Sequence, residues 1–77
     1  MLEKIFGQVL KNVREEAGLT QEALALSSGL DRTYISLLER GLRTPTIATL
    51  FKMSPHLHKT PSEIIADVER QLNENKL

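Results

Sequence analysis

The order of glycines and helix-capping residues imposes a pattern of short helices on this chain. Gly18 is followed by Thr20, and Gly29 is followed by Asp31. Glycine readily adopts the positive φ at which many helices end, and threonine and aspartate accept hydrogen bonds from the free N–H groups of a helix's first turn. The alternation predicts helices over residues 21–28 and 32–40.

The segment before Gly18 carries apolar residues at every third or fourth position, which is typical of an amphipathic helix. These residues are Leu2, Ile5, Phe6, Val9, Leu10, Val13 and Ala17. No segment of the sequence alternates apolar and polar residues as a half-buried strand does. We therefore expect residues 1–77 to form one compact all-α domain with five helices.

Two more helices are expected after Gly41, which should end the helix over residues 32–40. Thr44 is expected to cap the fourth helix, with Pro45 in its first turn, and Pro55 should kink that helix or end it early. Its apolar residues, expected in the core, are Ile47, Leu50, Phe51 and Leu57.

The fifth helix is expected over residues 61–75. The run Thr60-Pro61-Ser62-Glu63 has the spacing of a capping box, with proline at the first helical position. Its apolar stripe consists of Ile64, Ile65, Val68 and Leu72.

Basic residues are concentrated in the middle of the chain, although ten basic and ten acidic residues give a net charge of zero. Residues 32–59 hold five basic side chains against Glu39 alone, whereas residues 1–31 and 60–77 each carry a net charge of −2. A basic segment between acidic flanks suits an anionic partner such as nucleic acid. The alternative is chance clustering on solvated faces.

Several classes of protein do not fit the composition. The chain has no cysteine, and His56 and His58 alone cannot make a closed zinc site. No nucleophile with a base and an orienting group is recognisable, and no phosphate-binding loop is present, so neither an enzyme nor a cofactor, metal or small-molecule site is expected. No apolar run approaches the ~20 residues of a membrane span or the pattern of a signal peptide, which favours a cytoplasmic location.

Residues 21–40 have the features of a helix-turn-helix unit. Ala25 is small where two helices must approach closely, and Gly29 supplies the turn between them. Apolar residues spaced to lock the two helices together are Leu24, Leu30, Ile35 and Leu38. Two short helices around a short glycine-containing turn form this motif.

The second helix of the unit has one apolar and one hydrogen-bonding face. At ~100° per residue, one arc carries Arg32, Thr33, Ser36, Leu37 and Arg40, and the opposite arc carries Tyr34, Ile35 and Leu38. Arginine can pair with guanine in the major groove, serine and threonine reach several bases, and apolar groups touch the thymine methyl. An ordinary solvated face would favour glutamate and lysine, so the absence of acid here favours DNA.

These segments together resemble the Cro/repressor (XRE) helix-turn-helix family. The resemblance lies in residues 19–25, Gly29, residues 30–36, residues 38–41 and residues 43–46. It implies a five-helix, lambda-repressor-like DNA-binding domain. Residues 31–36, Asp-Arg-Thr-Tyr-Ile-Ser, also resemble the controller proteins of restriction–modification systems, which are small autoregulatory dimers without a second domain.

The resemblance assigns roles to individual residues. It implies base contacts by Arg32, Thr33 and Ser36, to which the arc adds Leu37. It implies backbone contacts by Gln21, Tyr34, Arg43, Thr44 and Thr46, and Arg40 is expected to join them. Arg14 and Glu39 match a structural ion pair. Pro55 and His58-Lys59 depart from the family pattern at the end of the fourth helix, which affects the path into the fifth.

The function expected from these observations is sequence-specific binding of double-stranded DNA by a transcriptional regulator. One recognition helix, residues 32–40, makes few base contacts, so a homodimer on a palindromic operator is expected. The stripe of Ile64, Val68 and Leu72 on the fifth helix is the expected dimer interface. An alternative is a protein–protein interaction module, such as an antitoxin-like partner or a co-regulator, that docks through the same helix.

Overall fold

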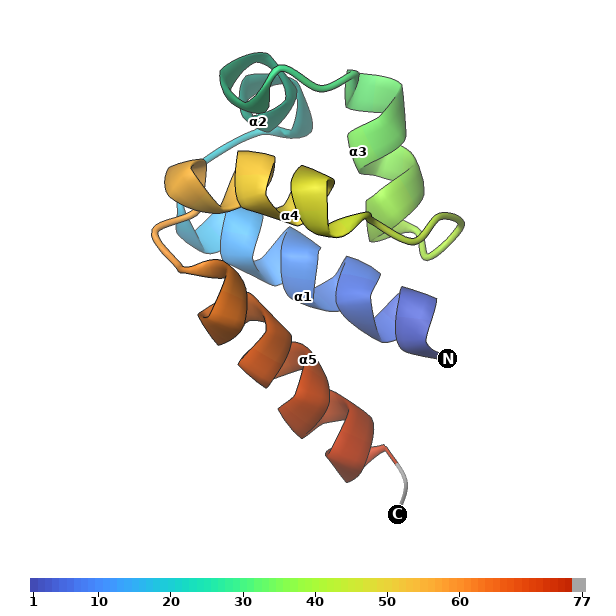
Figure 1. The fold of residues 1–77 in the computed structure, drawn as a ribbon. Coiled ribbons are helices and arrows are strands. Elements are labelled where there is room, and N and C mark those ends of the chain that lie inside the picture. The colour runs from blue at the N-terminus through green and yellow to red at the C-terminus, as the bar shows by residue number, and fades with distance from the viewer. Residues whose placement is uncertain (76–77) are drawn as a thin grey trace.

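The structure, a computed structural model, describes residues 1–75, which form five α-helices, one 3-10 turn and no strand (Figure 1). The α-helices are α1 (Leu2–Glu16), α2 (Gln21–Ser28), α3 (Arg32–Glu39), α4 (Ile47–Met53) and α5 (Pro61–Glu74), and the 3-10 turn is η1 (Ser54–His56). The all-α, five-helix expectation is confirmed. Residues 76 and 77, which the expected domain also includes, lie outside the described residues.

Three predicted caps are present. The Thr20 hydroxyl accepts a hydrogen bond from the Ala23 N–H at 3.0 Å, and the Asp31 carboxylate accepts one from the Thr33 N–H at 3.1 Å. Before α5, Thr60 and Glu63 form the reciprocal capping box, with bonds of 3.2 and 2.8 Å. These bonds satisfy donors that the helix backbone leaves free, and they fix where each helix begins.

The cap of α4 is Thr46, so the prediction of Thr44 was wrong. The Thr46 backbone is extended, and its hydroxyl accepts the Thr49 N–H at 3.0 Å. A second threonine two residues after the first competes for the same role, and a start at Thr46 turns Leu50 and Met53 into the core. Pro45 consequently precedes the cap instead of lying in the first helical turn.

The apolar residues of α4 do not share one buried face, as the sequence had suggested. Leu50 and Leu57 are buried, but 77% of Ile47 and 60% of Phe51 is exposed. Ile47 and Phe51 are four residues apart and lie on the same face, opposite the core. The helix does end early, because Pro55 lies within η1 directly after Met53.

The core is formed where α1 packs against both α3 and α5 while α2 packs against α3 (Figure 1). Its fully buried side chains come from every α-helix: Leu10, Leu24, Ile35, Leu38, Met53 and Ile64. A chain of this size buries only about 60% of its unfolded surface, so each of these contacts is a large share of the stability.

The expected dimer stripe on α5 belongs largely to this core. Ile64 is fully buried, 5% of Val68 is exposed, and Leu72 packs against the core at its edge. Ile64 is therefore core and has no surface to offer a partner, which corrects its place in the predicted interface, whereas Val68 also lines the apolar groove described below. Ile65 is the large apolar side chain of α5 that is exposed.

The segment between η1 and α5 follows a defined path despite its departure from the family pattern. His58 has a φ of 58°, in the left-handed region, and turns the chain towards α5. The Lys59 ammonium then donates to Asp67 at 2.8 Å and holds the pKa of that carboxyl below its ordinary value. Arg70 approaches the other oxygen of Asp67 at 3.1 Å.

None of the helices described is both long and apolar enough to cross a membrane.

Candidate nucleic-acid interface

The helices α2 and α3 meet at a tight turn centred on Gly29. This residue has φ 69° and ψ 30°, a left-handed conformation that glycine adopts without steric cost. The following Leu30 N–H donates to the Ala25 carbonyl at 2.9 Å and closes the end of α2. Because Leu24 and Ile35 are fully buried, the two helices are held together by their inner faces.

The outer face of α3 carries the side chains expected to contact bases. Arg32 and Thr33 are exposed in the first turn, and Ser36 and Leu37 are half-buried one turn later. Ile35 and Leu38, on the inner face, are fully buried. The inner contacts therefore fix the rotation of α3 and turn the expected base-contacting residues outwards.

Arg14 and Glu39 form a bidentate ion pair beneath this face. Arg14 Nε donates to Glu39 Oε2 at 2.6 Å, and Arg14 Nη2 donates to Glu39 Oε1 at 3.0 Å. Arg14 Nη1 also donates to the Leu19 carbonyl at 2.7 Å. The side chains are only 9% and 3% exposed, and the Glu39 carboxylate raises the pKa of Arg14. The pair ties α1 to the end of α3.

Gln21, at the N-terminus of α2, joins the same cluster. Its side-chain Nε2 donates to Glu39 Oε1 at 3.0 Å. An amide nitrogen carries two hydrogens, so one remains for an acceptor outside the protein. The free N–H groups of the first turn of α2 lie beside it and also suit an anion.

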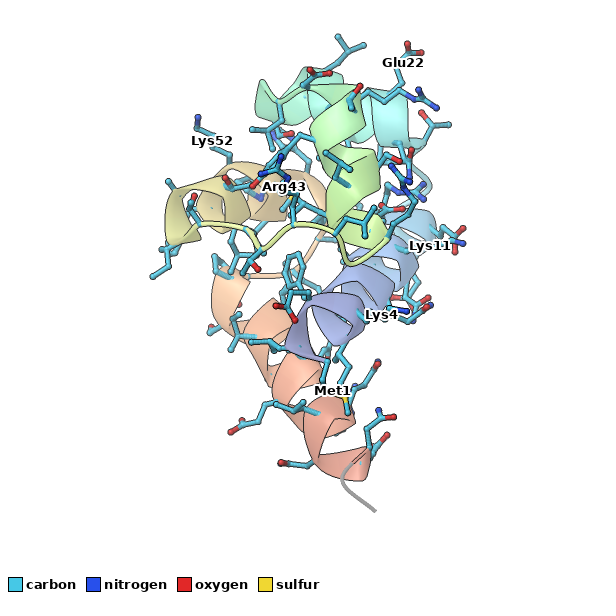
Figure 2. All side chains as sticks on the ribbon, turned by 90° about the vertical axis from the view of Figure 1, so that its right-hand side faces the viewer. Met1, Lys4, Lys11, Glu22, Arg43 and Lys52 are labelled. Atoms are coloured by element: carbon cyan, nitrogen blue, oxygen red, sulfur yellow. The ribbon has the colours of Figure 1, made fainter. Side chains whose placement is uncertain are left out.

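The loop from α3 to α4 provides further polar groups. Arg40, Arg43, Thr44 and Thr46 are all exposed. Figure 2 shows Arg43 on the loop at the same face of the molecule as α3. The Thr46 hydroxyl accepts a hydrogen bond from the backbone of α4. Tyr34 of α3, also expected to contact the DNA backbone, is less exposed than these residues because it packs partly against the core.

The sequence patterns missed an apolar groove beside this loop. Its lining includes Leu2 and Phe6 of α1, Pro45 of the loop, Ile47 of α4 and Ile65 of α5. The side chains of Leu2 and Ile65 are each about half exposed, and most of the Ile47 side chain is exposed. The signal was present in α4, because a seven-residue helix with apolar residues on both faces cannot bury them all.

Within residues 1–75, no three histidine, cysteine, aspartate or glutamate side chains are placed to hold a metal ion. The described side chains also include no buried polar atom without a hydrogen-bond partner. The polar groups of the interface are therefore either satisfied internally, as in the Arg14–Glu39 pair, or directed to solvent.

Comparison with known proteins agrees with this geometry. The family model described as "Helix-turn-helix" matches residues 10–64. The Control protein C.MunI of Mycoplasma sp is 42% identical over 67 residues, which are 86% of this chain and 90% of that protein. The HTH-type transcriptional regulator y4dJ of Sinorhizobium fredii is 35% identical over 88% of each chain.

Solved structures with the same fold include a restriction–modification controller protein. The restriction-modification controller protein C.AhdI from Aeromonas hydrophila is 41% identical, has a TM-score of 0.76, and covers 79% of this chain and 92% of its own. The clp gene regulator ClgR from Corynebacterium glutamicum has a TM-score of 0.91, covers 99% of this chain and 81% of its own, and at 22% identity shares the fold alone. This chain belongs to the helix-turn-helix family and is similar to restriction–modification controller proteins.

Proposed function

We propose that this protein is a DNA-binding transcription regulator that binds a palindromic operator as a homodimer, with α3 in the major groove of each half-site. The observation that carries the proposal is the outer face of α3, where Arg32 and Thr33 are exposed and Ser36 is half-buried, on a helix that the core holds at a fixed rotation. These side chains suit the hydrogen-bonding edges of base pairs.

The similarity to controller proteins supports a narrower role. Relatives whose names call them control proteins match most of this chain at 33–42% identity. We therefore infer that the operator lies in a promoter of a restriction–modification system and that the protein also controls its own gene. Selecting bound sequences from a random DNA pool would identify that operator.

Dimerisation requires an exposed apolar surface, and the groove beside the α3–α4 loop offers one. Leu2, Ile47 and Ile65 are exposed there together, and Phe51, one turn after Ile47 on α4, is exposed as well. Thr44 and Thr46, which are expected to contact the DNA backbone, line one part of the groove. A second copy packed on it would bring two α3 helices to one side of the duplex, with half-sites ~34 Å apart.

Ile47→Glu is expected to convert the dimer to a monomer, because it places a charge in an apolar contact. The fold should survive, since Ile47 is 77% exposed and glutamate is favourable in the first turn of a helix. Sedimentation at micromolar concentration measures the change. Leu26→Glu is the control, because Leu26 is equally exposed on α2 but lies outside the groove. A dimer that persists in Ile47→Glu contradicts this interface.

Arg32→Ala and Arg43→Ala are expected to weaken DNA binding in different ways. Arg32 lies in the first turn of α3, where its guanidinium can reach guanine, so its loss should cost about 1–3 kcal/mol at the operator and relax the choice at one base position. Arg43 lies in the loop, so its loss should weaken all sequences evenly and flatten the salt dependence by about one unit per copy.

Titrations of both variants against the operator and a scrambled duplex, at several salt concentrations, separate these roles. Equal losses on both duplexes for Arg32→Ala would show that Arg32 contacts phosphate and does not select bases. A wild-type protein that binds both duplexes equally well would contradict the proposed function itself.

A further inference from the structure

We propose that Lys4 and Lys11 of α1 form a second row of phosphate contacts, on the DNA that flanks each half-site. This inference rests on the proposed function and adds residues that lie outside the helix-turn-helix unit. Through these contacts the protein binds a longer stretch of DNA than the base pairs that α3 contacts.

Two glycines bring α1 directly against the end of α3. A Cβ on Gly7 would lie only 2.5 Å from the Leu38 carbonyl oxygen and 2.6 Å from that of Glu39. A Cβ on Gly41, at φ +75°, would lie 2.9 Å from Lys4 Cα and 2.8 Å from Lys4 Cγ. Lys4 therefore packs on the turn that leads from the recognition helix into the loop of Arg43.

Lys4 and Lys11 share one face of α1. They are seven residues apart, which is close to two helical turns, and Figure 2 shows them on the same side of that helix. Both are exposed, and neither lies within ion-pair distance of a carboxylate in residues 1–75. Glu15, one turn after Lys11, ends the row and is also without an ion pair in this part of the chain.

The same helix places the lysines away from the proposed partner. Leu2 and Phe6 line the apolar groove. Leu2 and Lys11 are nine residues apart, which is two and a half turns and hence opposite faces of α1. If a second copy fills the groove, the lysines point away from the two-fold axis of the dimer. The DNA phosphates that the lysines contact therefore lie outside the half-sites.

The test compares two operator duplexes, one that ends at the half-sites and one that extends by half a helical turn at each end. Lys4→Ala and Lys11→Ala are measured beside Lys52→Ala, which removes another exposed lysine, at the far end of α4 (Figure 2). Thermal unfolding of each variant shows that the fold is retained.

On the extended duplex, each of the two α1 variants should bind about tenfold more weakly and should flatten the salt slope by about two units, one contact for each copy. On the short duplex, both should bind as the wild type does, and Lys52→Ala should resemble the wild type on both. Equal losses on the two duplexes, no loss on either, or the same loss in Lys52→Ala overturns the proposal. Because wild-type preference for the operator is measured in the same experiment, failure of the lysine row is distinguishable from failure of the proposed function.

Discussion

Glu39→Ala is expected to lower the free energy of unfolding by about 3–5 kcal/mol, the cost of leaving a buried charge without its partner. The Glu39 carboxylate accepts hydrogen bonds from Arg14 Nε, Arg14 Nη2 and Gln21 Nε2. Its removal leaves two donors of the Arg14 guanidinium unpaired, in a side chain that is 9% exposed. A domain of this size has a total stability of about 4–12 kcal/mol, so the variant loses a large share of it and should unfold at a markedly lower temperature.

Urea and thermal unfolding followed by circular dichroism measure this effect. The matched control is the double variant Arg14→Met/Glu39→Leu, which removes both charges and keeps most of the volume. It should recover much of the lost stability, because replacing a buried ion pair with apolar side chains is often neutral or favourable. A loss of only about 0–1 kcal/mol in Glu39→Ala would mean that the pair behaves as an exposed one.

The sequence predicted the helices well because their ends are decided locally. Thr20, Asp31 and Thr60 each accept a bond from within their own first turn, so residue type and spacing suffice to locate them. The wrong choice of Thr44 as the cap of α4 also follows from relying on local capping. Thr44 and Thr46 are both good caps, and only the packing of Leu50 and Met53 into the core selects Thr46.

Residues that depend on how distant helices meet could not be predicted. The apolar spacing on α5 does not distinguish a core stripe from an interface, and Ile64 and Val68 proved to belong to the core. Similarly, nothing in the sequence around Lys4 indicates that it packs on Gly41, because the contact joins segments more than thirty residues apart. The Arg14–Glu39 pair was expected only through the family resemblance.

Gly7 is another position whose role comes from tertiary packing. In the sequence it is a glycine inside a helix, where alanine is intrinsically favoured by about 1 kcal/mol. Helix propensity alone therefore predicts that Gly7→Ala stabilises the protein. In the structure, a Cβ at this position meets backbone atoms of α3 at 2.5, 2.6 and 2.9 Å, all shorter than an ordinary contact.

Gly7→Ala is expected to lower the free energy of unfolding by about 1–3 kcal/mol, because the crowding outweighs the gain in propensity. The atoms it meets are the Leu38 carbonyl oxygen and the carbonyl group of Glu39, which cannot move without shifting the end of α3. The ion pair between Glu39 and Arg14 should be strained by the same displacement. Operator binding should therefore weaken as well, even though Gly7 itself has no side chain to contact DNA.

Chemical denaturation and operator titration of the same variant test both effects. Gln8→Ala is the control, because Gln8 is the next residue of α1, is exposed, and bonds only to the exposed Asn12. Its stability should change by no more than about 0.5 kcal/mol. The sign of the Gly7→Ala effect decides the question. A more stable variant would mean that α1 and α3 are not in close contact at this point, and the placement of Lys4 beside the recognition helix would then lose its support.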